Sequence, residues 1–193
     1  MHTWESLEEA CAGCTRCSLY QTRTSPVFGT GVKTAEIMLV GEGPGETEDL
    51  QGEPFVGKAG QLLDDMLKII GLDRKTNVYI ANIVKCRPPH NRDPLNQEQE
   101  ACIGWLREQY RLLQPRLVIC LGRIAAGAMI HADFKITKEH GQWFDKDGIP
   151  FIAIYHPAAL LRDETKRPET FVDLKTIERK IREVCPNTVL NKY

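Results

Sequence analysis

The sequence predicts an α/β protein with the architecture of a three-layer α/β/α sandwich. Four short runs of apolar and β-branched residues recur along the chain, and segments with helical periodicity lie between them. Runs that are apolar throughout, rather than alternating, are typical of parallel strands covered by helices on both faces. The 193 residues are enough for one domain with a real core, so we expect a single domain over residues 1–193.

The four apolar runs give the expected strands in chain order. They are residues 36–40 (EIMLV), 78–84 (VYIANIV), 117–121 (LVICL) and 151–155 (FIAIY). The stretch WFDKDGIPFI precedes the last strand and predicts a hairpin that turns at Asp147 and Gly148.

Three segments carry apolar residues at helical spacing. The first covers residues 62–70 and ends at Gly71, a residue typical of a helix C-terminus. The second covers residues 97–113, and Pro115 sets its end. The third covers residues 171–184 and stops before Pro186.

Charge and hydropathy limit the class of protein. The 25 basic and 26 acidic residues leave a net charge of -1, so any anion-binding surface must be local. The segment MHTWESLEEACAG lacks the basic and apolar regions of a secretory signal, and no apolar run is long enough to span a bilayer. We therefore expect a cytoplasmic protein with no membrane partner.

Unusual residues follow each expected strand. The segment 41–45 (GEGPG) follows the first strand, 82–90 the end of the second, 122–123 the third and 156–157 the fourth. Ligands of open parallel sheets bind at the carboxyl ends of the strands, so we expect these segments to converge on one site. Taken alone, a glycine-rich turn such as GEGPG is more often a phosphate loop or a simple turn. No P-loop lysine and hydroxyl follow it, which argues against nucleotide hydrolysis.

The chain has seven cysteines. A reducing compartment makes structural disulfides unfavourable, and an odd number of cysteines cannot all pair. Cys11, Cys14 and Cys17 are spaced C-x2-C-x2-C, and Cys86 and Cys102 are spaced C-x15-C. Two such groups can supply four ligands to one metal centre, although buried thiols without a metal are the alternative. The spacing does not distinguish zinc from an iron-sulfur cluster. Cys120 is expected in the core, and Cys185 is expected to bind no metal.

Five motifs together identify a family. They are GEGPGETED at 41–49, GEPFVGKAGQLLDDML at 52–67, ANIVKCRPP at 81–89, LGRIAA at 121–126 and HPAALLR at 156–162. In this order, with this cysteine layout, the chain resembles the family 4 uracil-DNA glycosylases. The resemblance implies the uracil-DNA glycosylase fold with a central four-stranded parallel sheet. It also implies a [4Fe-4S] cluster held by Cys14, Cys17, Cys86 and Cys102, with Cys11 free.

The resemblance implies a DNA repair enzyme of base excision repair, a hydrolase that flips uracil out of DNA and leaves an abasic site. Uracil-containing DNA, single- or double-stranded, would be the substrate, and we expect a monomer. Rotating a nucleotide out of a duplex costs a few kcal/mol, so something must fill the gap. We interpret Leu160 and Leu161 as an exposed wedge and Arg162 as a phosphate anchor; in the alternative both leucines begin a helix and pack inward. Arg87 and Arg92 are expected to supply positive charge for the DNA backbone.

The resemblance also assigns the base-binding residues. Phe55 resembles the aromatic residue on which uracil stacks, and Glu48 the side chain that crowds the C5 position and excludes thymine. Asn82 resembles the residue that reads the edge of the base, and its amide can accept from N3-H and donate to O4 of uracil. The alternative for Asn82 is a strand-end residue that satisfies nearby backbone. Backbone amides beside Gly43 and Gly45 could approach the base or a phosphate because these residues lack Cβ.

Two residues fit the charges of the reaction. Bond cleavage leaves positive charge on the sugar and negative charge on uracil. Glu42 fits the first charge, by stabilising the sugar or orienting the attacking water. His156 fits the second, by donating a hydrogen bond to uracil O2.

His90 departs from the resemblance. Family 4 members usually carry glycine at this position, whereas a related iron-sulfur class has a histidine in this loop that ends covalently bound to the sugar. An imidazole can attack a cationic carbon if it lies nearer than water. The loop KCRPPHNRDP lacks the longer basic insertion of that class, which favours turnover over trapping. His90 is thus a candidate nucleophile, with an exposed histidine near phosphate as the alternative.

Two other classes of protein fit the cysteines. One is a non-catalytic iron-sulfur redox sensor that binds DNA, in which Glu42→Ala and His156→Ala would leave activity unchanged. The other is a zinc-dependent interaction module, which would be colourless when purified.

Overall fold

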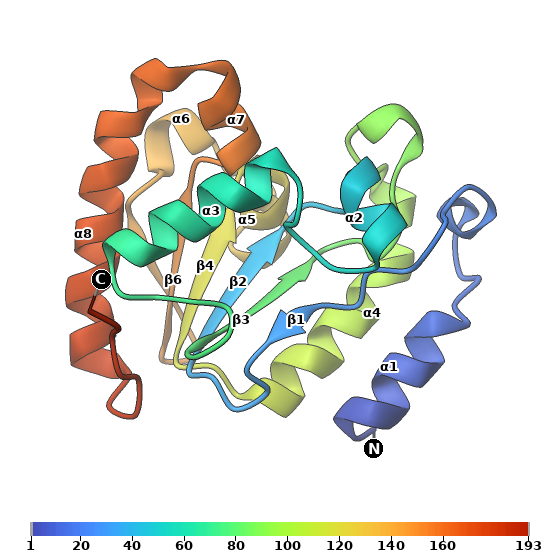
Figure 1. The fold of residues 1–193 in the computed structure, drawn as a ribbon, viewed down its shortest axis with the longest axis horizontal. Helices are drawn as coiled ribbons and strands as arrows, with labels where there is room; N and C mark the ends of the chain where they lie inside the picture. The colour runs from blue at the N-terminus through green and yellow to red at the C-terminus, as the bar shows by residue number, and fades with distance from the viewer. Residues whose placement is uncertain (1, 193) are drawn as a thin grey trace.

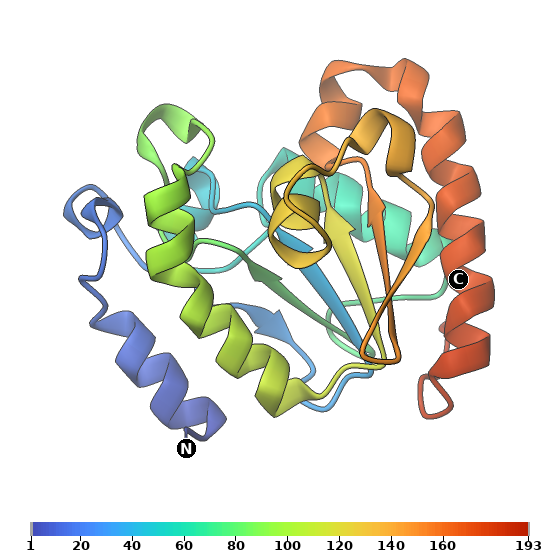
Figure 2. The same cartoon turned by 180° about the vertical axis from the view of Figure 1, so that it is seen from behind.

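The computed structural model describes residues 2–192, which form one six-stranded sheet with helices on both faces (Figures 1 and 2). Met1 and Tyr193, the two ends of the predicted single domain, lie outside the described residues. The strand order is β1-β3-β2-β4-β6-β5. The fold class predicted from the sequence is confirmed.

The four predicted strands form the parallel centre of the sheet. They are β2 (Ile37–Gly41), β3 (Val78–Asn82), β4 (Leu117–Leu121) and β6 (Ile149–Ile154). Two short antiparallel strands lie at the edges, β1 (Thr30–Gly31) beside β3 and β5 (Trp143–Lys146) beside β6. The predicted hairpin joins β5 to β6, and Asp147 and Gly148 both have positive φ, at 54° and 80°, as its turn requires. The edge strand β1 was not predicted.

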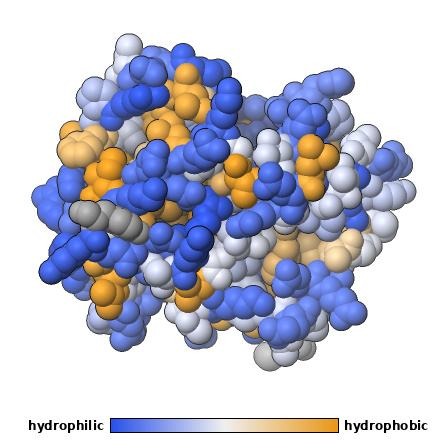
Figure 3. All heavy atoms as spheres, in the orientation of Figure 1, coloured by the Kyte–Doolittle hydropathy of each residue, from blue (hydrophilic) through white to orange (hydrophobic). Residues whose placement is uncertain are grey.

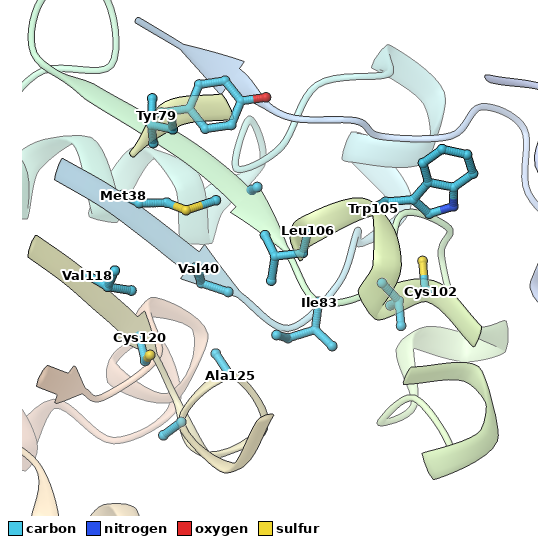
Figure 4. Close-up of a cluster of buried hydrophobic side chains, with 14 of the residues drawn as sticks. Met38, Val40, Tyr79, Ile83, Cys102, Trp105, Leu106, Val118, Cys120 and Ala125 are labelled. Atoms are coloured by element: carbon cyan, nitrogen blue, oxygen red, sulfur yellow. The ribbon is translucent and has the colours of Figure 1, made fainter. Parts of the chain in front are cut away.

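One face of the sheet is covered by α1 (Trp4–Ala12), α4 (Asn96–Leu113) and α5 (Arg123–Met129). In Figure 4, Met38 and Val40 of β2 lie in one buried cluster with Leu106 of α4 and Ala125 of α5. The intervening residues of the same strand point to the other face, as the two-residue period of a strand requires.

The other face is covered by α3 (Lys58–Ile69), α7 (Pro157–Arg162) and α8 (Arg167–Val184), and α3 crosses it in Figure 1. Ile37 and Leu39 of β2 pack here with Leu63 of α3 and Ile177 of α8. The two cores on opposite faces of one sheet make the predicted three layers. The remaining short elements are η1 (Ser18–Gln21), α2 (Glu46–Gln51), η2 (Pro89–Asn91), α6 (Ile136–Glu139) and η3 (Glu164–Lys166).

The surface in Figure 3 is mostly polar, and its apolar side chains lie in small separate groups. Across residues 2–192, no helix has the length and hydropathy needed to cross a membrane.

Candidate active site

A cavity of about 490 Å³ lies at the carboxyl ends of the parallel strands. The segments that follow β2, β3 and β6 converge on it, as predicted for a ligand site of this fold. The segment after β4 supports the site without lining it, because Gly122 packs against His156. The lining comprises residues 42–48, 57–59 and 91–93 with Phe55, Asn82, Pro88, His156, Ala158 and Arg162.

Asn82, the last residue of β3, lines this cavity with a side chain that is only 1% exposed. Its Oδ1 is the one buried side-chain oxygen or nitrogen of residues 2–192 that no protein group hydrogen-bonds. A buried polar group without a partner costs about 1–3 kcal/mol. An amide left in this state beside a cavity is suited to a ligand that brings the missing donor.

Phe55 also lines the cavity, and its ring centroid lies 5.6 Å from that of His156. Its φ of 56° is unusual for a residue other than glycine, so the turn needs support. Arg74 supplies it, because its guanidinium donates to the carbonyl oxygens of Pro54 and Phe55 at 2.9 and 2.7 Å. A Cβ on Gly41 would overlap both the Phe55 ring and Asn82 Oδ1. The absence of a side chain at Gly41 therefore leaves space for both the Phe55 ring and the Asn82 amide.

Glu48 lines the cavity, but its carboxylate is engaged with the backbone. Oε1 accepts hydrogen bonds from the amides of Val56 and Gly57 at 2.9 and 2.8 Å. Glu48 thus holds the segment that follows Phe55. Gly43 and Gly45 line the same wall, and both lie close to other side chains of the protein.

His156 follows β6 directly and is the N-cap of α7. Its Nδ1 accepts a hydrogen bond from the backbone amide of Ala158 at 3.1 Å. Burial, with a smaller effect of Arg162, lowers the pKa of His156 to about 4. The ring is therefore neutral at neutral pH, and the amide on Nδ1 leaves its proton on Nε2. His156 can act as a neutral donor.

Glu42 follows β2 and shares the cavity with a second carboxylate, Asp93. Burial, with a smaller contribution from Asp93, raises the pKa of Glu42 to about 7, while Arg123 and Arg162 oppose the rise. Arg123 donates to Asp93 Oδ2 at 2.6 Å. The charge of Glu42 is thus set by its burial and by an adjacent ion pair.

The loop after β3 places its residues differently from one another. His90 has a φ of 56° and an exposed side chain, and it does not line the cavity, whereas residues 91–93 do. Arg92 donates to both carboxylate oxygens of the buried Glu98, at 2.9 and 2.7 Å. Arg87 donates to Asn91 Oδ1 at 2.7 Å. Both arginines therefore have partners within the protein.

The two leucines of HPAALLR differ in burial. Leu160 is 1% exposed and packs in the core beneath α7, whereas Leu161 is 43% exposed. The expectation that both form an exposed wedge is wrong for Leu160, because α7 begins at Pro157 and turns this side chain toward α3 and α8. Leu161 and Arg162 remain exposed beside the cavity mouth.

A second cavity is lined by cysteines from both groups that were predicted to supply metal ligands. Cys14, Cys17, Cys86 and Cys102 line it together with Cys11, which is buried. Within residues 2–192, no three or more histidine, cysteine or acidic side chains are grouped so as to hold a metal ion. Cys120 and Cys185 lie apart from this cavity and are buried.

Three of these sulfur atoms accept hydrogen bonds from nitrogen. Trp105 Nε1 donates to Cys14 at 3.4 Å, and Arg23 Nη1 donates to Cys86 at 3.2 Å. The backbone amide of Lys85 donates to Cys102 at 3.2 Å. Donors of this kind stabilise sulfur that carries negative charge.

Asp93, Lys58 and Arg74 were not among the predicted site residues. Asp93 lies in the quoted loop KCRPPHNRDP, and a carboxylate beside a basic residue was the available signal. Lys58 lines the cavity, and Arg74 supports Phe55 from 19 residues further along the chain. Arg123 belongs to the segment predicted to converge on the site, but its pairing with Asp93 was not predicted.

The chain is similar to known proteins over most of its length. Residues 28–178 match the uracil DNA glycosylase superfamily. The type-4 uracil-DNA glycosylase of Archaeoglobus fulgidus is 43% identical, with 96% of this chain and 94% of that protein aligned. The type-4 uracil-DNA glycosylase of Thermotoga maritima is 41% identical over 91% of each chain. The type-5 uracil-DNA glycosylase of Pyrobaculum aerophilum is 31% identical over 78% of this chain and 79% of its own.

Proposed function

We propose that this chain, which belongs to the uracil-DNA glycosylase superfamily, removes uracil from DNA by hydrolysis. It is similar to type-4 members of the superfamily over most of its length. The bond between C1′ of the sugar and N1 of uracil breaks, and the oxygen of water bonds to C1′. Uracil leaves and takes up a proton, and the DNA keeps an abasic site. The observation that carries this proposal is the buried, unpartnered Oδ1 of Asn82 in the cavity.

Asn82 reads the base in this proposal. Its Oδ1 accepts from N3-H of uracil, and its Nδ2 donates to O4. Cytosine offers a bare nitrogen and an amine in these places, so an amide held in one orientation rejects it. Sites built on such hydrogen bonds discriminate by roughly 10⁴- to 10⁵-fold.

Phe55 provides the surface on which uracil stacks. The support of its turn by Arg74 favours a ring that is in place before the base arrives. The exclusion of thymine by Glu48 stays a prediction. The hydrogen bonds that its carboxylate accepts from Val56 and Gly57 support a second role, which is to hold the segment beside Phe55 in the cavity lining.

His156 stabilises the departing base. A neutral ring with its proton on Nε2 donates to uracil O2 as negative charge develops there. Because the donor is neutral, this role needs no protonated histidine and is the same across the physiological pH range.

Glu42 acts on the sugar side. As a carboxylate it stabilises positive charge on the sugar or orients the attacking water. Its raised pKa supports a group whose charge changes close to neutral pH.

DNA approaches over the exposed side chains beside the cavity. Leu161 fills the gap left by the flipped base, and Arg162 contacts a phosphate. Arg87 and Arg92 add positive charge, although each already has a partner within the protein. The proposal covers uracil in single- and double-stranded DNA. That the protein acts as a monomer of one domain in the cytoplasm stays a prediction.

Cys14, Cys17, Cys86 and Cys102 are the proposed ligands of a [4Fe-4S] cluster. Their convergence on one cavity, with N-H donors on three of the four sulfurs, supports this assignment. When bound, the cluster supplies a cross-link between the N-terminal segment and the β3–α4 loop. Brown colour and stoichiometric iron and sulfide in the purified protein would distinguish it from a zinc site.

The first test uses an end-labelled uracil oligonucleotide. Incubation followed by alkali should give a strand break at uracil and none at cytosine, with several turnovers per protein molecule. The Asn82→Ala variant should lose most of this activity. Absence of the break with iron-loaded wild-type protein would overturn the proposed function.

The same samples test the covalent alternative through a denaturing protein gel. We expect no label to migrate with the protein, because His90 lies outside the cavity lining. Label that stays with the protein, and is lost in His90→Gly but kept in His131→Gly, would instead make this a single-turnover trap. His131 is a control because it does not line the cavity.

A further inference from the structure

Lys85 lines the cysteine cavity and is hydrogen-bonded to Asn82, a residue that lines the active-site cavity. It follows β3, three residues after Asn82 and one before Cys86. The residue is 1% exposed, and it lines the cysteine cavity. A lysine buried to this extent needs a specific reason, since an ammonium group is costly to remove from water.

The hydrogen bonds of Lys85 reach toward both sites. Its Nζ donates to the backbone oxygen of Asn82 at 2.9 Å and to Gln109 Oε1 at 2.7 Å. Its backbone amide donates to Cys102 Sγ at 3.2 Å. One residue is thus bonded directly to the proposed base reader and to a proposed cluster ligand.

Gln109 fixes the position of this ammonium group. Gln109 is fully buried, and its Nε2 donates to the backbone oxygen of Phe28 and to the hydroxyl of Tyr79, at 2.8 and 3.0 Å. The amide nitrogen is therefore committed to these acceptors, and Oε1 is directed at Lys85. A fully satisfied buried network of this kind holds its members in one arrangement.

The charge of Lys85 has no carboxylate partner. Among the described residues no acidic side chain forms an ion pair with Lys85, and the two acceptors of its Nζ, the backbone oxygen of Asn82 and Gln109 Oε1, are neutral. The groups that can carry negative charge near it are the sulfurs of Cys11, Cys86 and Cys102. Cluster-bound thiolates at Cys86 and Cys102 would supply the countercharge that a buried cation requires.

Asn82 divides its contacts between the two sides. Its backbone oxygen accepts from Lys85, while its side chain lines the active-site cavity, with Oδ1 buried and without a protein donor. We propose that Lys85 is a positioning residue that couples the cysteine cavity to uracil recognition by holding Asn82 in place. The inference rests on the proposed function and gives the cysteine cavity a part in reading the base.

The test is Lys85→Met in the iron-loaded protein, a change that removes the cation and both Nζ hydrogen bonds. The reduction potential of the bound cluster should become more negative, because a positive charge beside its ligands is lost. The KM for a uracil oligonucleotide should rise about tenfold with a much smaller change in kcat, because uniform binding is lost. In an Asn82→Ala background the same substitution should still shift the potential but leave KM unchanged.

Lys85→Gln provides a second variant if Lys85→Met does not fold. It removes the cation and shortens the side chain, so that the bond to the backbone oxygen of Asn82 is lost, and the potential and KM should move in the same directions. An unchanged potential, an unchanged KM, or an effect on KM that persists in Asn82→Ala would overturn the inference. If the wild-type protein excises uracil and these variants behave like the wild type, only the proposed coupling is refuted. If the wild-type protein does not excise uracil, the proposed function is refuted.

Discussion

The pH dependence of uracil excision tests the role of Glu42 most directly. Because the proposed role of Glu42 requires a carboxylate, and burial raises its pKa to about 7, the rate should fall as pH falls through about 7. One pH unit below its pKa a carboxyl group is about one-tenth ionised, so excision at pH 6 should be about one-tenth of the plateau rate. His156 should add no second step above pH 5, because its pKa lies at about 4.

Substitutions around Glu42 should move this profile in opposite directions. Asp93→Asn removes a negative charge that raises the pKa of Glu42, so the fall in rate should shift to lower pH. Arg123→Ala removes a positive charge that lowers this pKa and frees Asp93 from its ion pair, so the fall should shift to higher pH. Asp145→Asn, in the edge strand β5, serves as the control and should leave the profile unchanged.

Single-turnover excision from a single-stranded uracil oligonucleotide between pH 5 and 9 gives these profiles without interference from product release. A rate that is constant from pH 5 to 8 would refute the assignment of Glu42 as the required carboxylate. Shifts of the same sign in Asp93→Asn and Arg123→Ala would refute the electrostatic explanation.

Three further predictions concern stability and substrate contacts. Leu160→Ala should lower the free energy of unfolding by about 2–5 kcal/mol in denaturant titrations, because it opens a cavity in the core, whereas Leu161→Ala should leave stability unchanged and slow excision from duplex DNA more than from single strands. Equal loss of stability in the two variants would contradict this. Arg74→Ala should lower the free energy of unfolding by about 2–3 kcal/mol and raise KM, because the carbonyl of Phe55 loses its donor. A lower melting temperature with an unchanged KM would show that Arg74 has a structural role only. Asn82→Ala should reduce kcat/KM at least about a hundredfold with no loss of thermal stability, and a smaller loss would mean that another residue reads the base.

The parts of this fold that could be predicted are those specified by local pattern. The central strands are apolar throughout because both faces are covered, and the long helices show a clear stripe and a defined end, such as Gly71 with its φ of 74°. The edge strand β1 has two residues, too few for any period to show. The helix α7 has six residues, and this length leaves the inward or outward direction of Leu160 undetermined until α3 and α8 are in place.

The candidate site divides along the same line. Residues at the ends of strands or directly after them, such as Glu42, Asn82 and His156, could be located because the carboxyl ends of parallel strands share one edge of the sheet. Contacts between distant segments could not be predicted, because no local pattern specifies them. The pair of Asp93 with Arg123 spans 30 residues and the bond of Lys85 to Gln109 spans 24.

The packing of α1 on α4 has a consequence for synthesis of the chain on the ribosome. The first helix ends at Ala12, and its packing partner ends at Leu113, so about 100 residues must follow before α1 can dock. At roughly 5–20 residues per second this interval lasts about 5–20 seconds. During it the nascent chain exposes Leu7 and Cys11, which the finished protein buries. We therefore expect α1 to dock late, with the thiol of Cys11 open to reagents until α4 has left the exit tunnel.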